Sequence, residues 1–238
     1  MSAPVLDMTA VVKDYRGLRP LRVERLTLDA GARLAIMGMD APAAEMMTTL
    51  VTAAAVPDAG AIHVLGTRTA DITSSEQWLA LIDRIGLVTD RAALLDMMTA
   101  IQNLALSFTL QIDQLSDDRR THMEALATAV GLPAAVWERP VGSLTAAHRT
   151  RLRLGRALAL GPSLLLLEHP TAQVAREDID ALAQDIEAVA RDRQIATLAL
   201  TADAAFADAM GMRVLEWDPA SGSLHERKRR WWPWTGVR

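Results

Sequence analysis

Apolar and polar positions follow two alternating patterns along this 238-residue chain, and these patterns predict its strands. Residues 5–12 and 21–28 alternate well enough to be strands of an antiparallel layer with one buried face. A second group of short, almost wholly apolar runs comprises residues 33–37, 85–88, 164–167 and 196–200. Apolar runs of this length, bounded by turn residues, are typical of strands buried on both faces of a parallel sheet.

Helical patterns separate these runs. Four stretches are helical in pattern, namely residues 47–55, 76–83, 177–191 and 203–210. Residues 91–160 are mostly helical in pattern and form a predicted helical subdomain, while residues 213–217 and 224 onward predict a hairpin. Strands that alternate with helices predict an α/β fold. We expect one domain over residues 1–227 and a separate tail at 228–238.

Residues 144–171 carry the most informative pattern. Leucines and arginines interleave over residues 146–160, which predicts a basic amphipathic helix with Thr145 as its N-cap and the arginines on its solvated face. The apolar strand that follows ends in Glu168 and His169. Because ligands of open parallel sheets bind beyond the carboxyl ends of the strands, this order of elements predicts a site at Glu168.

Composition narrows the class of protein. The net charge of −4 argues against a general nucleic-acid binder, and the absence of cysteine excludes disulfides and thiolate metal sites. The N-terminus shows no signal-peptide pattern, and no apolar run approaches the roughly 20 residues that a membrane helix needs. We therefore expect a cytoplasmic protein, and we predict no metal site built from histidines, since their spacing fits none.

The stretch 144–171 also resembles the segment from the signature helix to the Walker B strand of ATP-binding-cassette (ABC) ATPases. LTAAH stands in the place of the family's LSGGQ, and LLLLEHPT in the place of its strand ending Asp-Glu-Pro-Thr. Residues 85–104 resemble the family's Q-loop segment, most closely that of cassettes serving lipid and lipoprotein transporters. The resemblance spans about residues 5–227. It implies a P-loop NTPase-like (RecA-like) parallel sheet, an antiparallel β layer and an inserted helical subdomain at about 91–160.

The resemblance assigns the nucleotide positions, and many of them carry unusual residues. The assigned cofactor-binding residues are Tyr15 at the adenine, Gly38, Ala41, Ala43, Ala44, Glu45 and Met46 in the P-loop, and Thr145, Ala146 and Ala147 in the signature. The P-loop pattern GxxxxGK[ST] places a lysine at Ala44 and a hydroxyl at Glu45. Losing a charged donor costs about 1.5–3 kcal/mol, and a carboxylate beside phosphate adds repulsion. Tyr15 could equally be a half-buried strand-end residue.

The catalytic positions depart from the family in the same direction. The assigned residues are Glu168 and His169 in Walker B, Asp90 at the Q-loop glutamine and Ala202 at the switch histidine. We expect none of them to be functional, because phosphoryl transfer depends almost wholly on positioning and charge stabilisation. A histidine that acts as a base remains the alternative for His169.

The resemblance therefore implies a degenerate cassette. We expect at most weak binding of ATP and Mg²⁺, lost or severely impaired hydrolysis, and a structural or regulatory role. The implied partners are an ABC transporter membrane subunit, which would dock at the groove near residues 90–110, and a second cassette in a homodimer or heterodimer. This places the chain on the inner face of the cell membrane. The alternatives are a working transporter ATPase that uses Glu45, Glu168 and His169, and an interaction module outside transport.

The tail combines four cations with tryptophans in Arg227-Lys228-Arg229-Arg230-Trp231-Trp232-Pro233-Trp234. Tryptophan favours the membrane interface and basic clusters are attracted to anionic headgroups, so the tail predicts contact with a membrane surface. A disordered tail, or tryptophans packed on the domain, is the alternative. RNA stacking fits the acidic body of the chain less well.

Overall fold

The computed structural model describes residues 3–227, which contain two sheets. The larger sheet has six strands in the order β10-β9-β3-β8-β7-β6. Its strands are β3 (Arg33–Met37), β6 (Ile85–Val88), β7 (Leu164–Glu168), β8 (Ala196–Leu200), β9 (Arg213–Trp217) and β10 (Leu224–Glu226). All neighbours pair in parallel except β10, which pairs antiparallel with β9 as the C-terminal hairpin. The predicted parallel sheet and hairpin are confirmed.

The smaller sheet is antiparallel and has the order β2-β1-β4-β5. Its strands are β1 (Leu6–Lys13), β2 (Leu21–Leu28), β4 (Ala59–Val64) and β5 (Thr67–Arg68). Leu6 pairs with Leu28 at one end of the β1–β2 ladder and Lys13 with Leu21 at the other. The alternation, interrupted once in each strand, places one face of this sheet in the core, as the sequence predicts.

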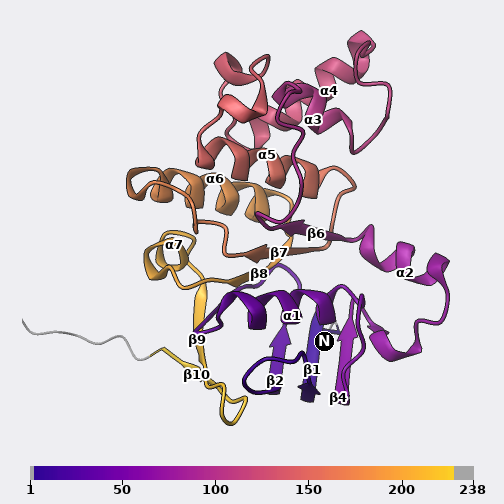
Figure 1. Cartoon of the computed structure of the whole chain (residues 1–238), viewed down its shortest axis with the longest axis vertical. Coiled ribbons are helices and arrows are strands. Elements are labelled where there is room, and N and C mark those ends of the chain that lie inside the picture. The colour runs from indigo at the N-terminus through magenta and orange to yellow at the C-terminus, as the bar shows by residue number, and fades with distance from the viewer. Residues whose placement is uncertain (1–2, 228–238) are drawn as a thin grey trace, which may run out of the picture.

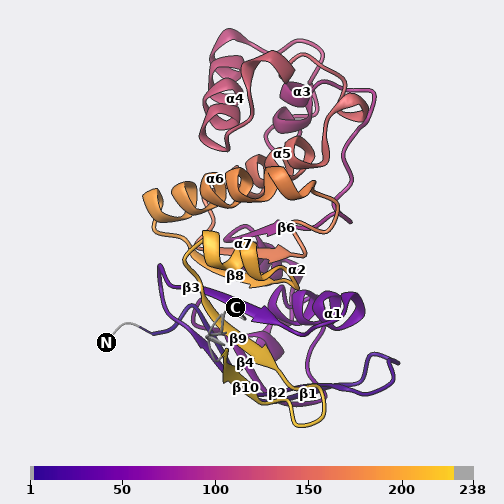
Figure 2. The ribbon, with the colours of Figure 1, turned by 90° about the vertical axis from the view of Figure 1, so that its left-hand side faces the viewer.

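Helices fill the space between the sheets and cover the far face of the larger one (Figures 1 and 2). The α-helices are α1 (Ala41–Val51), α2 (Ser75–Ile82), α3 (Ala100–Ala105), α4 (Asp117–Ala129), α5 (Ala146–Leu158), α6 (Ile179–Asp192) and α7 (Ala204–Ala209). Helix α1 lies between the two sheets, whereas α5 and α6 lie on the opposite face of the larger sheet. Helices α3 and α4 form the outermost layer beyond α5.

The strand β7 shows how the two cores are built. Leu164 and Leu166 belong to the core around α1 and the smaller sheet, while Leu165 and Leu167 belong to the core around α5 and α6. Successive side chains of a strand point to opposite faces, so a strand between two helical layers must be apolar throughout. All four leucines are at most 2% exposed.

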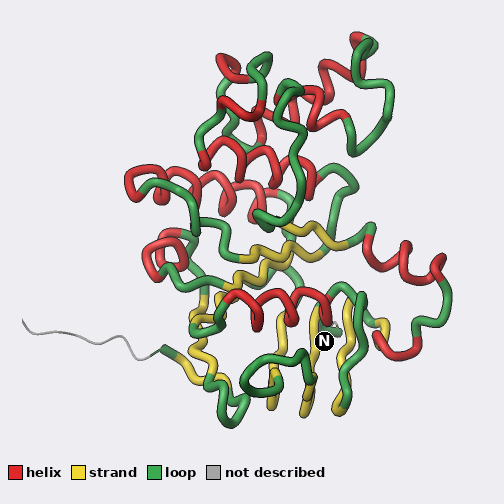
Figure 3. The backbone as a smooth tube through the Cα atoms, in the orientation of Figure 1, coloured by secondary structure: helices red, strands yellow, loops and turns green. Residues whose placement is uncertain are grey.

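An irregular segment, residues 89–99, connects the carboxyl end of β6 to α3 (Figure 3). We call residues 89–93, at its start, the linker. Thr145 caps α5 as predicted, and Ser116 caps α4 in the same way; each accepts a backbone hydrogen bond from the third residue of its helix. Among the described residues, no helix is long and apolar enough to cross a membrane. The predicted membrane contact of the tail falls almost wholly on residues 228–238, outside the described part.

Candidate functional site

The N-terminus of α1 is closed by the chain's own carboxylate. Gly38 follows β3 with φ +95, and a Cβ there would lie 3.1 Å from the carbonyl oxygen of Trp217, so glycine suits both the turn and the space. Asp40 is the N-cap, and its Oδ1 accepts a hydrogen bond of 2.9 Å from the backbone N–H of Ala43. Pro42 supplies no N–H to this turn. An anion thus already sits where a helix N-terminus would attract a phosphate.

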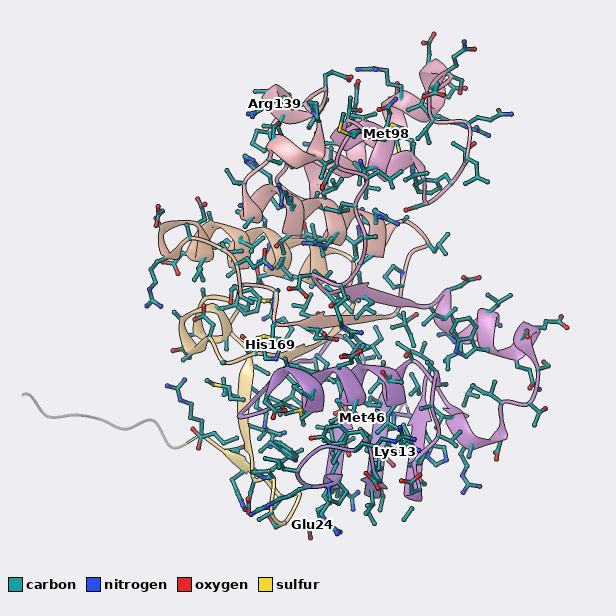
Figure 4. The ribbon with its side chains drawn as sticks, viewed as in Figure 1. Lys13, Glu24, Met46, Met98, Arg139 and His169 are labelled. Carbon is teal, nitrogen blue, oxygen red and sulfur yellow. The ribbon has the colours of Figure 1, made fainter. Side chains whose placement is uncertain are left out.

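The next residues of α1 turn away from any polar ligand. Ala43 and Ala44 are 1% and 0% exposed and pack in the core between the sheets. Met46, labelled in Figure 4, also packs partly against this core. The glycine and lysine positions of the P-loop therefore present methyl groups to apolar surroundings. Glu45 lies on the outer face, with its side chain 52% exposed.

Glu168 ends β7 as a buried carboxylate with its side chain only 7% exposed. The Thr89 hydroxyl donates to its Oε1 at 3.3 Å. Arg91 donates from Nε to the same oxygen at 3.0 Å and from Nη2 to Oε2 at 2.6 Å. The two parallel hydrogen bonds form the bidentate geometry that suits a planar guanidinium. This hydrogen bonding, together with the nearby negative charges, raises the pKa of Arg91.

The same guanidinium also binds Glu45. Its Nη1 donates to Glu45 Oε1 at 2.8 Å, so a single arginine from the linker joins the helix α1 to the end of β7. The patterns in the sequence did not single out Arg91. The available signal was an arginine next to the Q-loop position, in a chain with acidic residues at two positions that the family uses around a cation.

A second set of arginines holds the linker from the other side. Arg153 of α5 donates to the carbonyl oxygens of Asp90 at 3.0 Å and Ala92 at 3.2 Å, and Arg156 donates to Ala93 at 2.6 Å. Burial lowers the pKa of Arg153. The predicted solvated arginine face of α5 is therefore wrong at these positions, because the irregular linker covers it and leaves carbonyl groups that need donors.

Another arginine of α5 is also buried, for a different reason. Arg151 is 7% exposed and pairs with Asp185 of α6 through two hydrogen-bonding nitrogens, at 2.8 Å and 2.6 Å. The pair ties α5 to α6. Asp90, at the Q-loop glutamine position, accepts a hydrogen bond of 3.2 Å from Gln173, so its carboxylate is engaged away from the Glu168 bridge.

His169 has an unusual backbone and an unsatisfied ring. Its φ of +44 lies in the left-handed region, and its N–H donates to the carbonyl of Leu200 at 2.8 Å. The ring atom Nε2 is buried and finds no hydrogen-bond partner among the described residues. His169 lines a cavity of about 30 Å³ toward α5 and a wider hollow toward α7, where Ala202 is exposed (His169 is labelled in Figure 4).

The signature residues lie on the other side of the larger sheet from α1. Thr145 accepts a hydrogen bond of 3.3 Å from the N–H of His148, and Ala147 is 2% exposed. Ala146 lines the small cavity with His169. Since α1 and α5 pack on opposite faces, one copy of the chain does not bring its P-loop and signature positions together.

Tyr15 follows β1 and is half-buried against the core around α1. A Cβ at Gly17 would come within 2.8 Å of its ring, so the turn after Tyr15 folds closely over the ring. Burial, and to a smaller extent the charge of Asp40, raises the pKa of Tyr15. The ring thus lies close to the α1 N-terminus, where the resemblance places the nucleotide base.

The side chains at these positions do not fit Mg²⁺-ATP. The position of the phosphate-binding lysine holds the buried methyl of Ala44, and the Asp40 carboxylate takes up an N–H of the α1 N-terminus. The two carboxylates that could ligate Mg²⁺ are joined by Arg91 instead. Within residues 3–227 no group of three or more acidic, histidine or cysteine residues could hold a metal ion.

Comparisons with known proteins agree with this architecture. The family model described as "ABC transporter" matches residues 21–172. The lipoprotein-releasing system ATP-binding protein LolD of Nitratidesulfovibrio vulgaris is 28% identical over 233 residues, covering 96% of this chain and 97% of the relative. LolD of Psychrobacter arcticus is 26% identical over 186 residues, covering 77% of this chain and 82% of the relative.

Solved structures show the same fold. The dimeric structure of MJ0796, a bacterial ABC transporter cassette, has a TM-score of 0.77 at 20% identity and covers 95% of this chain and 100% of that one. The cbiO1 protein of Clostridium perfringens, part of the ABC transporter complex cbiONQ, has a TM-score of 0.79 at 16% identity, covering 94% and 87%. The larger sheet is thus the P-loop NTPase-like sheet that the sequence predicts. With a matching family model over more than half of its length, the chain belongs to the ABC transporter family.

Proposed function

We propose that this chain is the cassette subunit of a transport complex and that it acts structurally or as a regulator, without hydrolysing ATP. Its relatives include ATP-binding proteins of lipoprotein-releasing systems, which supports a role beside a membrane permease. The observation that carries the proposal is the bridge from Arg91 to Glu45 and Glu168. Hydrolysis in P-loop enzymes requires a lysine and Mg²⁺ at the phosphates. Here the lysine position holds the buried Ala44, and the two carboxylates that could bind Mg²⁺ pair with Arg91.

Docking on the permease would use the surface between the linker and α5. A hollow of about 240 Å³ is lined there by Leu87, Ala92, Ser107, Arg153, Ala157 and Leu160, among others. Large apolar side chains are exposed in the segments before and after α3 and just beyond the end of α5: Leu95, Met97, Phe108, Leu110 and Leu160. Met97 and Leu110 are each 88% exposed, although burial of such side chains is favourable. An exposed apolar group of this kind is typical of a protein-binding surface.

Substitution of this surface tests the docking site. Met97→Asp and Leu110→Asp are expected to abolish co-purification with the membrane subunit while leaving the melting temperature unchanged, because both side chains are solvent-exposed. Leu18→Asp is the matched control, since Leu18 is fully exposed but lies in the loop after β1. Equal loss of the partner in all three variants would refute a docking site at this place.

The absence of hydrolysis is tested on the native complex. Phosphate release and calorimetric titration with Mg²⁺-ATP are compared for the isolated chain and for the chain with its membrane partner. We expect no release above background from sites formed by this chain, and no binding that approaches that of a cassette with an intact P-loop. Turnover that disappears in Glu168→Ala would reject the non-hydrolytic role.

A working ATPase is the second candidate, favoured by one observation. The Nε2 of His169 is buried at the carboxyl end of β7 without a partner, where a base would stand. In this alternative His169→Ala abolishes turnover, and Glu45 or Glu168 binds Mg²⁺. If the chain only provides structure, His169→Ala changes neither phosphate release nor partner binding.

The location follows from the docking proposal. A subunit bound to a permease lies on the cytoplasmic side of the cell membrane, as a homodimer or beside a second cassette. Residues 228–238 keep their sequence-based prediction of contact with anionic lipid. Deleting them is expected to reduce co-flotation with anionic vesicles and not with neutral ones. Unchanged co-flotation would show that the tail does not contribute to membrane binding.

A further inference from the structure

The linker is bound on two sides by side chains of different layers. On one side Arg91 reaches Glu168 at 2.6 Å and Glu45 at 2.8 Å, which belong to β7 and α1. On the other side Arg153 and Arg156 of α5 donate to its carbonyl oxygens. Five residues therefore connect the sheet, the helix between the sheets and the helical layer.

The charges around Arg91 resemble those around a bound cation. Glu168 is buried and carries two of the contacts, while Glu45 is half-exposed and carries one. The Thr89 hydroxyl supplies a neutral oxygen at Glu168. Two carboxylates and a hydroxyl are hard oxygen ligands of the kind that divalent cations prefer. Here the positive charge between them is covalently attached to the chain.

We propose that Arg91 is a built-in cation that permanently joins α1, β7 and the linker, so that the helical layer keeps its position whether or not nucleotide or Mg²⁺ is present. This inference rests on the proposed function in one respect, since it takes the site as one that does not turn over. A diffusible cation would make the same connection conditional on its concentration. With Arg91 the connection is present whenever the chain is folded.

Removing the charge should turn this place into a real cation site. Arg91→Met keeps an unbranched apolar stem but loses the guanidinium and its charge, which leaves Glu168 buried without the counter-charge that Arg91 supplies. We expect a fall in melting temperature of about 3–8 °C and amide exchange in residues 89–93 that is about tenfold faster or more. Millimolar Mn²⁺ should then restore much of the lost melting temperature.

Three controls separate this role from a simple loss of packing. Arg91→Met combined with Glu45→Gln should lose the response to Mn²⁺, because one of the two carboxylates is gone. Arg153→Met should loosen the linker without creating any response to Mn²⁺. Arg91→Lys serves if the methionine variant fails to fold. Its ammonium group keeps the charge but cannot form two parallel hydrogen bonds to one carboxylate. The backbone amides of residues 89–93 should therefore exchange faster than in the wild type.

The wild-type chain gives the decisive comparison. Its melting temperature should respond neither to Mn²⁺ nor to chelator, and its linker should stay protected in both. A Mn²⁺-dependent rise in the melting temperature of the wild type, removed by Glu45→Gln, would overturn the proposal. Unchanged amide exchange in both Arg91 variants would also overturn it. So would a melting temperature of Arg91→Met that Mn²⁺ does not restore. All measurements use the isolated full chain, so they stand apart from phosphate release and partner binding, which test the proposed function.

Discussion

Helices α1 and α5 start in the same way but differ in charge. Each follows an extended residue whose side chain accepts a hydrogen bond from the third residue of the helix, Asp40 in α1 and Thr145 in α5. The α1 cap is a carboxylate, with Glu45 one turn further on. The α5 cap is a neutral hydroxyl, followed by the arginines Arg149 and Arg151.

The two helix N-termini therefore differ in the charge that they would present to an anion. At α1 a negative charge already occupies the positive end of the helix dipole, so an added anion is repelled. At α5 the N-cap is neutral, Ala147 is buried at 2% exposure, and arginines follow in the next turns. Its arginines serve the structure, as when Arg149 donates to the carbonyl of Gly142 at 2.8 Å.

The largest expected effect concerns the two carboxylates that Arg91 joins, Glu168 of β7 and Glu45 of α1. Glu168→Gln should lower the free energy of unfolding by about 1.5–3 kcal/mol, since it removes a charge that accepts two guanidinium hydrogen bonds in a buried place. Glu45→Gln should cost less than about 1 kcal/mol, because its ion pair is half-exposed. Urea unfolding of both variants measures the difference. Equal losses would show that burial does not set the strength of this bridge.

Exchanging the two caps tests whether charge distinguishes the helices. Asp40→Ser keeps a capping oxygen and removes the charge, so it should lose about 0.3–1 kcal/mol, and Thr145→Asp should gain a similar amount. Both changes should shrink in high salt, which screens the interaction with the helix dipole. If the two substitutions shift the melting temperature in the same direction, the caps differ in something other than charge.

The smallest effect is a pH dependence at the α5 end. Burial, followed by the positive charge of Arg151, lowers the pKa of His148 below its usual 6.5. The unfolded chain therefore binds this proton more readily than the folded one, and the stability contributed by neutral His148 is present above about pH 6.5 and is lost as the pH falls below it. His148→Gln should flatten the stability profile between about pH 5 and 7. An unchanged profile would show that the pH dependence of stability comes from a group other than His148.

The strands could be predicted because their signal is local. The run Leu164–Leu167 is apolar at every position, and only a strand covered on both faces requires that. Thr145 could be predicted as a cap for a similar reason, since the capping bond lies within one turn of the helix. The P-loop and Walker B positions followed from the resemblance, and the structure places them at the ends of β3 and β7.

The partners of the arginines could not be predicted from the same patterns. Arg91 meets Glu168, 77 residues further on, and Glu45, 46 residues back, only because β6, β7 and α1 come together in the fold. Arg153 and Arg156 occupy polar positions of an amphipathic helix, which predicts solvent. They are covered by an irregular segment whose path carries no periodic signal in the sequence.

The buried methyl of Ala44 has a consequence for chemical inhibition. Compounds that mimic a triphosphate gain much of their affinity from the P-loop lysine, and this chain offers a side chain that is 0% exposed and uncharged in its place. If the proposed function holds, such compounds would spare this subunit even where they block a second cassette.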